Sequence, residues 1–327
     1  MISFSKDKDP IEAVRENVRK AISLRRKLFG DFSNQAIRLI HAEADELPGL
    51  VVDLYDKTLV FQSSTAGIDA LKDSILQVLF EELDPLWVYE KSNSPSRKVE
   101  KCPIIQKSLF GTIIDPVLIE ENGIQHVIPI EKGQKSGFFI DQREMRSLVR
   151  RLSKGKRVLN CFSYTGGFSL AALKGGAISC TSVDCSEEAL QVLDENLQKN
   201  KLQSASHTAV CDDCFSYLRT DSLDYDLIVL DPPAFAKKRG DIAQASKGYR
   251  DINFQVMKKA KPETLLLTSS CSYYIDEATF KKVLFQAAQA AQREVQILSH
   301  HIHSFDHPES IFVPETSYLK SYLLRIV

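Results

Sequence analysis

The stretch Asn160-Cys161-Phe162-Ser163-Tyr164-Thr165-Gly166-Gly167-Phe168 decides the fold class of this chain. It follows a strand-like run, Arg157 to Asn160, and leads into a helix-like run, which is the layout of a nucleoside-binding turn. The three spaced glycines that let a backbone approach a pyrophosphate are absent. The adjacent pair Gly166-Gly167 follows an aromatic, hydroxyl-rich loop instead. This pattern favours a ligand without phosphates.

Strand-like and helix-like runs alternate from about residue 131 to the C-terminus. Such alternation predicts a Rossmann-like α/β fold, with a mostly parallel, seven-stranded sheet covered by helices on both faces. The strand-like runs are 157–160, 178–183, 206–210, 226–230, 264–268, a run around Val295 and 318–326, and the helix-like runs start at Phe168 or span 186–200, 251–259 and 277–291.

Aspartates follow several of these strands, at the edge of the sheet where open α/β folds bind ligands. Asp184 lies roughly 20 residues beyond the glycine turn, where a carboxylate accepts ribose hydroxyls. Asp213 is expected to accept the amino group of adenine. The alternative for each is to cap the helix that follows. Their order along one α/β unit favours a class I S-adenosylmethionine (SAM) methyltransferase.

In this interpretation the glycine turn lets the backbone approach the methionine part of SAM. The expected cofactor-binding residues belong to the turn and to the strand ends; they are Asn160, Ser163, Tyr164, Thr165, Gly166, Asp184, Asp213 and Asp231.

The sequence Asp231-Pro232-Pro233-Ala234-Phe235 follows another apolar run, Leu227 to Leu230. Two prolines fix φ at consecutive residues, so the loop is stiff and can hold a carboxylate and an aromatic ring against a planar substrate. The alternative is a purely structural turn. In enzymes that methylate exocyclic amines the aromatic residue directly follows the prolines, whereas Ala234 intervenes here.

Cys271, in Ser269-Ser270-Cys271-Ser272, follows the strand-like run 264–268 and reaches the same edge of the sheet. Free cysteines are usually buried small residues, which is the alternative here. Next to a methyl donor, a thiolate that adds to C6 of a pyrimidine makes C5 nucleophilic. Cys161 is a rival thiol, but it lies inside the cofactor turn.

The N-terminal part differs in pattern, and we predict domains at 1–36, 37–130 and 131–327. The first is an amphipathic helix that begins at Asp9-Pro10 and ends near Gly30. Its basic residues form either a solvated face or an RNA contact; they are Arg15, Arg19, Lys20, Arg25, Arg26 and Lys27. The second is a small α+β unit with strands at 37–42, 50–54, 58–63 and 86–90, a helix at 68–80, a mobile loop at 92–101 and a hairpin at Asn122-Gly123.

Composition limits how this chain can bind RNA, where it can be located and how its cysteines are used. The 327 residues carry a net charge of -1, so RNA binding must depend on local patches. We expect a cytoplasmic protein, because no apolar leader or membrane-length run occurs. Seven scattered cysteines are expected to be reduced thiols. The CxxC spacing of Cys211 and Cys214 lacks a second pair, which argues against zinc or redox use, and no metal is predicted.

The chain resembles the RlmI-type family, the large-subunit ribosomal-RNA 5-methylcytosine methyltransferases, from about Ile37 to the C-terminus. The matching pieces are 40–53 (IHAEADELPGLVVD), 133–143 (GQKSGFFIDQR), the glycine turn, 231–235 (DPPAF), 248–253 (GYRDIN), 270–272 (SCS), 306–308 (DHP) and 315–320 (ETSYLK).

The resemblance implies a class I methyltransferase fold preceded by a small α+β domain. It also implies that Cys271 is the nucleophile and that four further residues help to enclose SAM; they are Lys135, Phe138, Asp141 and Arg143. About 36 residues precede Ile37, too few for the PUA domain with which family members commonly begin, so we expect this domain to be lacking. Related RNA 5-methylcytosine enzymes carry a second cysteine where Ala234 stands, so another group must assist release of the adduct.

We therefore predict a SAM-dependent RNA methyltransferase that forms 5-methylcytosine in ribosomal RNA. Asp231 would hold the flipped base, and the expected substrate contacts are Pro232, Phe235 and Lys238. One alternative is an enzyme that methylates an exocyclic amine or another base atom without forming a covalent adduct. Another is a SAM-binding RNA assembly factor with little activity. The sequence leaves dimer formation open.

Overall fold

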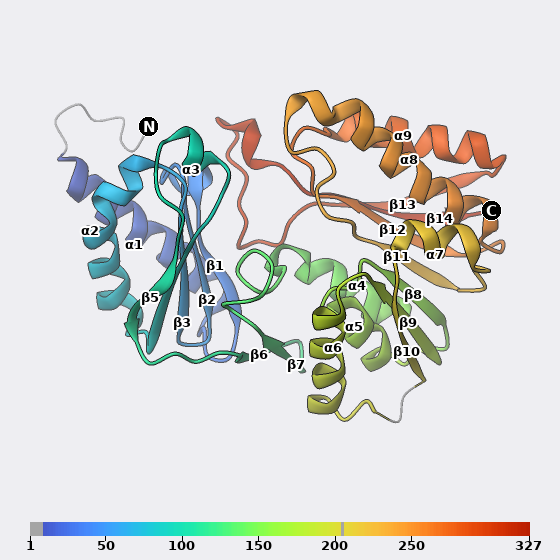
Figure 1. The fold of residues 1–327 in the computed structure, drawn as a ribbon, viewed down its shortest axis with the longest axis horizontal. Coiled ribbons are helices and arrows are strands. Elements are labelled where there is room, and N and C mark those ends of the chain that lie inside the picture. Colours follow the sequence, from blue (N-terminus) through green and yellow to red (C-terminus); the bar gives the residue numbers. More distant parts are fainter. Residues whose placement is uncertain (1–8, 204–205) are drawn as a thin grey trace. The chain divides into compact units, whose positions relative to one another are not determined.

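The computed structural model describes residues 9–203 and 206–327, which fall into two compact units (Figure 1). The first consists of the chain up to Arg143 together with Ser304–Thr316, and the second of Glu144–His303 and Ser317–Val327. The domain division at residues 36 and 130 stays a prediction. No helix in the described ranges combines the length and apolar character needed to cross a membrane.

The first unit is built on a five-stranded sheet with the order β1-β2-β3-β4-β5. Neighbouring strands are antiparallel except β3 and β4, which are parallel. Helices α1 and α2 share one apolar core with the sheet, in which Val18, Ile75 and Val52 are fully buried. The elements are α1 (Pro10–Phe29), β1 (Ala36–His41), β2 (Leu50–Tyr55), β3 (Thr58–Ser63), α2 (Ala66–Leu83), β4 (Trp87–Ser92), α3 (Ser96–Val99), β5 (Ile105–Gly111), β6 (Val117–Glu121) and β7 (Ile124–Ile128).

The basic side of α1 is largely paired within this unit. Arg15 and Arg19 both contact Glu81 of α2, and Arg26 contacts Glu82. Glutamates of α2 thus account for the charges of Arg15, Arg19 and Arg26, and the RNA contact of this helix stays a prediction. Arg25 is fully buried and makes a bidentate ion pair with Asp45, at 2.6 and 2.8 Å.

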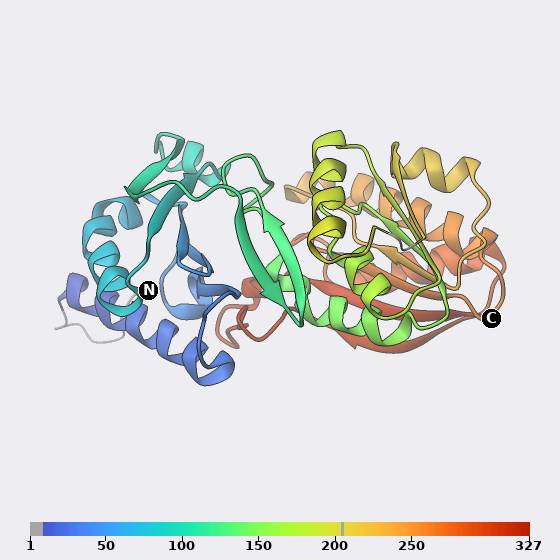
Figure 2. The same cartoon turned by 90° about the horizontal axis from the view of Figure 1, so that it is seen from below.

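The prediction of a mobile loop at 92–101 was wrong. This segment contains α3, and the fully buried guanidinium of Arg97 bonds both oxygens of Asp69, at 3.1 and 2.9 Å, and the Ser63 carbonyl at 2.9 Å. The predicted hairpin is confirmed, since β6 and β7 form a twisted two-stranded ribbon (Figure 2). Asn122 and Gly123 supply positive φ angles of 52° and 73° at its turn.

The second unit contains the predicted mostly parallel, seven-stranded sheet. Its order is β10-β9-β8-β11-β12-β14-β13, and only β14 runs antiparallel to its neighbours. Helices α4 to α6 cover one face and α7 to α9 the other (Figure 1). The elements are α4 (Arg143–Leu152), β8 (Arg157–Cys161), α5 (Gly167–Lys174), β9 (Ser179–Asp184), α6 (Glu187–Lys199), β10 (His207–Cys211), α7 (Cys214–Thr220), β11 (Leu227–Leu230), α8 (Ile242–Lys259), β12 (Leu265–Ser270), α9 (Glu277–Ala291), β13 (Val295–His301) and β14 (Lys320–Ile326).

The order of the strands fixes the place of a ligand site. The chain passes from β8 to β9 on one side and later returns to β11 on the other side of β8. Loops that leave the adjacent strands β8 and β11 run in opposite directions, so a crevice opens between the carboxyl ends of these strands. The glycine turn after β8, Asp184 at the end of β9 and Asp231 after β11 therefore share one edge of the sheet.

Candidate active site

The glycine turn is held in a tight conformation. Gly166 has a φ of 83°, and a Cβ built there would lie 2.5 Å from Cδ1 of Leu193 on α6. Its N–H donates to the Ser163 carbonyl at 2.9 Å. Phe162 and Tyr164 also adopt positive φ angles, 58° and 48°, which L-residues adopt only at an energetic cost. The crowding at Gly166 is with Leu193 of α6, so this bend requires glycine at position 166.

Asp184 ties this turn to the neighbouring strand. One carboxylate oxygen accepts the N–H of Tyr164 at 2.8 Å, and the other accepts the N–H of Ser186 at 3.0 Å. The Oγ of Ser186 caps α6 by accepting the N–H of Ala189, so the helix-cap alternative for Asp184 does not hold. Each oxygen of Asp184 keeps a lone pair that can accept a ligand hydroxyl.

Buried polar atoms at the turn remain unsatisfied. Asn160 donates from Nδ2 to Ser169 at 2.9 Å, but its Oδ1 is buried without a hydrogen-bond partner among the described residues. The same holds in those ranges for the Oγ of Ser163. Buried polar groups are nearly always paired, so these atoms indicate a polar ligand at the turn.

Two adjacent aspartates follow β10, and the structure distinguishes them. Asp213 is exposed and caps α7 by accepting the N–H of Ser216 at 2.9 Å, which is the alternative considered for it. Asp212 is half-buried, and its N–H donates to the Asp184 carbonyl at 3.1 Å. Asp212 thus lies at the strand end beside Asp184, a position that its place directly after β10 could have revealed.

The structure brings Cys271 together with the Asp231-Pro232 loop. Cys271 directly follows β12 and is half-buried, and its thiol donates to the Pro232 carbonyl at 3.7 Å. The rival thiol of Cys161 is fully buried; burial, reinforced by the adjacent Cys214, raises its pKa well above the usual value. A thiol that resists ionisation is a poor nucleophile, so Cys271 is the better candidate.

Ser272 fixes the position of Cys271. Its Oγ accepts the N–H of Ala236 at 3.1 Å and bonds the Tyr249 hydroxyl at 2.9 Å. Its carbonyl accepts a hydrogen bond from the buried ammonium of Lys320 on β14, at 2.8 Å. Lys320 was assigned no role from the sequence, because its partner lies 48 positions away.

The expected substrate residues differ in exposure. Pro232 is buried and Lys238 is exposed. Phe235 is half-buried, with its ring centroid 4.5 Å from that of Tyr249 and 5.7 Å from that of Phe215. The ring of Phe235 therefore packs into an aromatic cluster.

The model of the family described as S-adenosylmethionine-dependent methyltransferase matches residues 98–325. The chain belongs to this family. The chain is similar to proteins named ribosomal RNA large subunit methyltransferase I from Shewanella amazonensis (38% identical, covering 94% of this chain and 79% of the relative) and from Pseudoalteromonas atlantica (36% identical, covering 96% and 80%).

Solved structures agree with this assignment. The crystal structure of SMU.776, a methyltransferase complexed with SAH, superposes with a TM-score of 0.87, at 26% identity, over 99% of this chain and 84% of that one. The tRNA m1G37 methyltransferase of M. jannaschii has a TM-score of 0.61 at 17% identity, covering 85% of this chain and 76% of that one, and shows the shared fold alone. This methyltransferase therefore uses SAM as its methyl donor.

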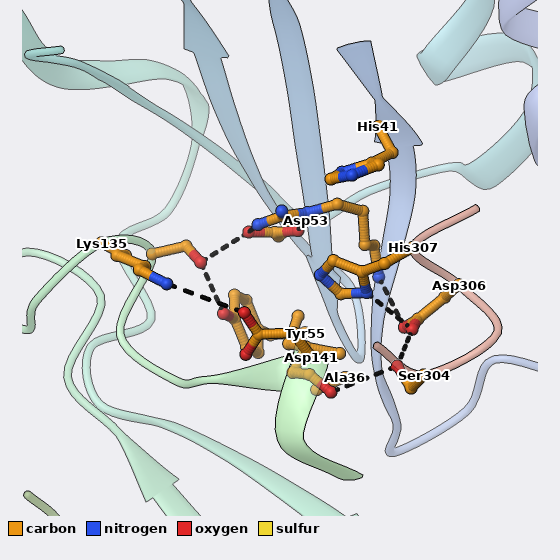
Figure 3. A network of polar contacts seen from close by, with 12 residues as sticks. Ala36, His41, Asp53, Tyr55, Lys135, Asp141, Ser304, Asp306 and His307 are labelled. Carbon is orange, nitrogen blue, oxygen red and sulfur yellow. Dashed lines mark hydrogen bonds and ion pairs between the residues drawn. The ribbon is translucent and has the colours of Figure 1, made fainter. Parts of the chain in front are cut away.

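Four further expected cofactor residues of the methyltransferase, at positions 135, 138, 141 and 143, lie in the first unit, where Lys135 and Asp141 belong to a polar network (Figure 3). Lys135 Nζ lies 3.7 Å from an oxygen of Asp141. Phe138 is buried beside the His126 ring, with centroids 4.9 Å apart. Arg143 donates to the Ala36 carbonyl and pairs with Glu121 at 3.6 Å and with Asp306 at 3.4 Å. The SAM-enclosing role of all four residues stays a prediction.

Nowhere in 9–203 and 206–327 do three or more His, Cys, Asp or Glu side chains gather to hold a metal ion. The CxxC cysteines have separate surroundings, since Cys211 is exposed, whereas Cys214 is buried and its sulfur accepts the N–H of Phe162 at 3.1 Å.

Proposed function

We propose that this methyltransferase forms 5-methylcytosine in ribosomal RNA through a covalent adduct of Cys271. The observation that carries the proposal is the thiol of Cys271 at 3.7 Å from the Pro232 carbonyl, next to Asp231 and at the edge of the sheet that holds the glycine turn. The names of the relatives support ribosomal RNA as the substrate class.

The residues of the second unit fit SAM. Asp184 would accept the ribose hydroxyls, and the bent backbone around Gly166 leaves room for the methionine part. The unsatisfied oxygens of Asn160 and Ser163 offer polar partners. We assign the adenine amino group to Asp212 rather than Asp213, because Asp212 is half-buried beside Asp184, whereas Asp213 is exposed at the start of α7. When bound, SAM supplies an electrophilic methyl group.

The chemistry of the chain begins with the base. Asp231 would hold the extruded cytosine by its N3 or N4 edge, on a loop stiffened by two prolines. The Cys271 thiolate adds to C6 and forms a carbon–sulfur bond, and the electron pair of the C5–C6 double bond makes C5 nucleophilic. After C5 is methylated, a base takes up the C5 proton, and the electron pair left behind restores the C5–C6 double bond as the carbon–sulfur bond breaks and the thiolate leaves.

Bisulfite sequencing of ribosomal RNA from a deletion strain and its complemented parent tests this function. Loss of one protected cytosine in the deletion strain, restored by the wild-type gene, is the expected result. A methylated exocyclic amine or other base atom in its place would favour the non-covalent alternative. Unaltered methylation throughout would favour an assembly factor that binds SAM.

Replacing Asp184 by Ala should weaken SAM binding by about 1.5 to 3 kcal/mol, because hydrogen bonds to a charged acceptor are lost. Titration calorimetry measures the affinity directly. Glu195→Ala on the exposed side of α6 is a matched control that should bind SAM as the wild type does. Wild-type affinity in the Asp184 variant would remove this residue from the site.

The two aspartates after β10 should separate in the same titration. Asp212→Ala should weaken SAM binding, whereas Asp213→Ala should leave the affinity near wild type and lower the free energy of unfolding by about 1 kcal/mol, as loss of a helix cap does. The reverse pattern would return the adenine contact to Asp213.

A further inference from the structure

Two exposed tyrosines stand immediately after Cys271. The residues Tyr273 and Tyr274 are 44% and 37% exposed, and their ring centroids lie 5.0 Å apart in an edge-to-face pair. Large aromatic rings left open to solvent next to a catalytic residue indicate a contact with another molecule.

The backbone presents these rings on a rigid turn. The N–H of Ile275 donates to the Ser272 carbonyl at 3.2 Å, so the tyrosines occupy the two central positions of a four-residue turn. Both ends are fixed, because Ser272 and Ile275 are fully buried. Central turn positions are usually Gly, Pro, Asn, Asp or Ser, so turn formation does not explain two tyrosines.

A run of basic residues starts close to Ser272, where the tyrosine turn also starts. Since the N–H of Ala236 donates to Ser272, the basic loop that follows Ala236 starts beside the start of the tyrosine turn. The exposed basic residues of this loop form no ion pair with any other described residue; they are Lys237, Lys238 and Arg239. In a chain with a net charge of -1, this is a local basic patch.

We infer that the tyrosine turn and this basic patch together bind a single-stranded segment of the RNA that flanks the target base. The inference rests on the proposed function. Bases stack on exposed aromatic rings whatever their sequence, and cations bind the phosphates between them. A duplex keeps its bases stacked on each other, so the tyrosines select unpaired RNA. They thereby hold the neighbours of an extruded base in place.

The test measures binding of a labelled, unstructured, cytidine-rich RNA of about ten nucleotides by fluorescence anisotropy, with SAH present. The double variant Tyr273→Ala/Tyr274→Ala should bind about 5- to 100-fold more weakly, with an unchanged salt dependence. Tyr273→Phe/Tyr274→Phe should retain binding, because stacking needs the ring alone. Phe285→Ala, at a 65% exposed ring on α9, is the matched control and should bind as wild type.

The contribution of the basic residues is tested by the salt dependence of RNA binding. Lys238→Gln/Arg239→Gln should reduce the slope of log affinity against log salt by about 0.7 per charge removed. All variants should bind SAH as the wild type does, which excludes misfolding.

Wild-type affinity in the tyrosine-to-alanine variant, or equal binding of the same sequence as a duplex, would overturn the inference. These results leave the proposed function to the bisulfite experiment, which reports the modified atom and does not depend on the oligonucleotide.

Discussion

Cys271→Ala is expected to abolish methyl transfer while the protein stays folded and binds SAM. Without addition of a thiol at C6, C5 of cytosine has too little carbanion character to attack a sulfonium methyl. Incorporation of labelled methyl groups into ribosomal RNA from a deletion strain measures activity, and calorimetry measures SAM binding.

Trapping gives a second measurement of the same prediction. RNA with 5-fluorocytosine at the target should form a covalent complex with the wild type, because fluorine at C5 cannot leave as a proton does. The Ala variant should form none. Cys161→Ala is the control: its thiol is fully buried in the core, so its removal should lower stability and leave chemistry intact. Substantial turnover by Cys271→Ala would exclude the adduct mechanism and favour non-covalent methylation.

Asp306→Ala is expected to lower the free energy of unfolding by about 3 to 5 kcal/mol, because it leaves buried positive charge without its partner. The carboxylate of Asp306 is fully buried; it accepts the backbone N–H of Arg38 at 3.1 Å and pairs with Arg143 at 3.4 Å and with His307 at 2.9 Å (Figure 3). Urea unfolding measures the loss. Glu315→Gln changes an exposed residue in the same segment, Ser304–Thr316, and should leave the free energy of unfolding almost unchanged. Equal stability of both variants would mean that the network contributes little.

The contacts of Asp306 also predict that the protein loses stability in acid. Burial alone would raise the pKa of Asp306, but the hydrogen bond from His307 and the charges of His307 and Arg143 outweigh it and hold this pKa well below its usual range. Its stabilisation is present above the unfolded pKa of about 3.9 and is lost as the pH falls toward the folded value.

His307 acts at higher pH. Burial and the charge of Arg38 lower the pKa of its imidazole, against the opposing effect of Asp306. The unfolded chain therefore takes up this proton first, and stability should begin to fall below about pH 6.5. Unfolding of His307→Gln across the same pH range should show a smaller first decline; part of it remains, because burial also lowers the pKa values of His207 and His301.

The sequence predicted what local pattern determines. Strand 58–63 and helix 277–291 were placed to the residue, and the loops after β11 and β12 were identified because polar residues interrupt apolar runs there. The partners of charged groups could not be predicted in this way. The basic helix α1 seemed open to RNA because its neutralising glutamates lie on α2, more than 50 positions away.

Two further differences have similar causes. Neighbouring Asp212 and Asp213 are equivalent in sequence pattern, and only the structure shows that Asp212 is half-buried while Asp213 is exposed and caps α7. Strand β5 was missed because it lies at the edge of its sheet, where mostly exposed side chains remove the apolar signal. Edge strands carry little of the alternation on which such predictions depend.

The segment that leaves the second unit after β13 and rejoins it before β14 makes the two units inseparable by a single cut. The strands themselves form an antiparallel pair, with His301 opposite Ser321, so the excursion begins and ends at adjacent points. In topological terms, residues 304–316 are a long insertion in the β13–β14 hairpin, and this insertion belongs to the first unit. An experimenter who wants the catalytic half alone must both remove the N-terminal half and shorten this loop to a tight turn. Removal of the N-terminal half alone would expose Asp306 and His307 to water, although both are buried in the intact protein.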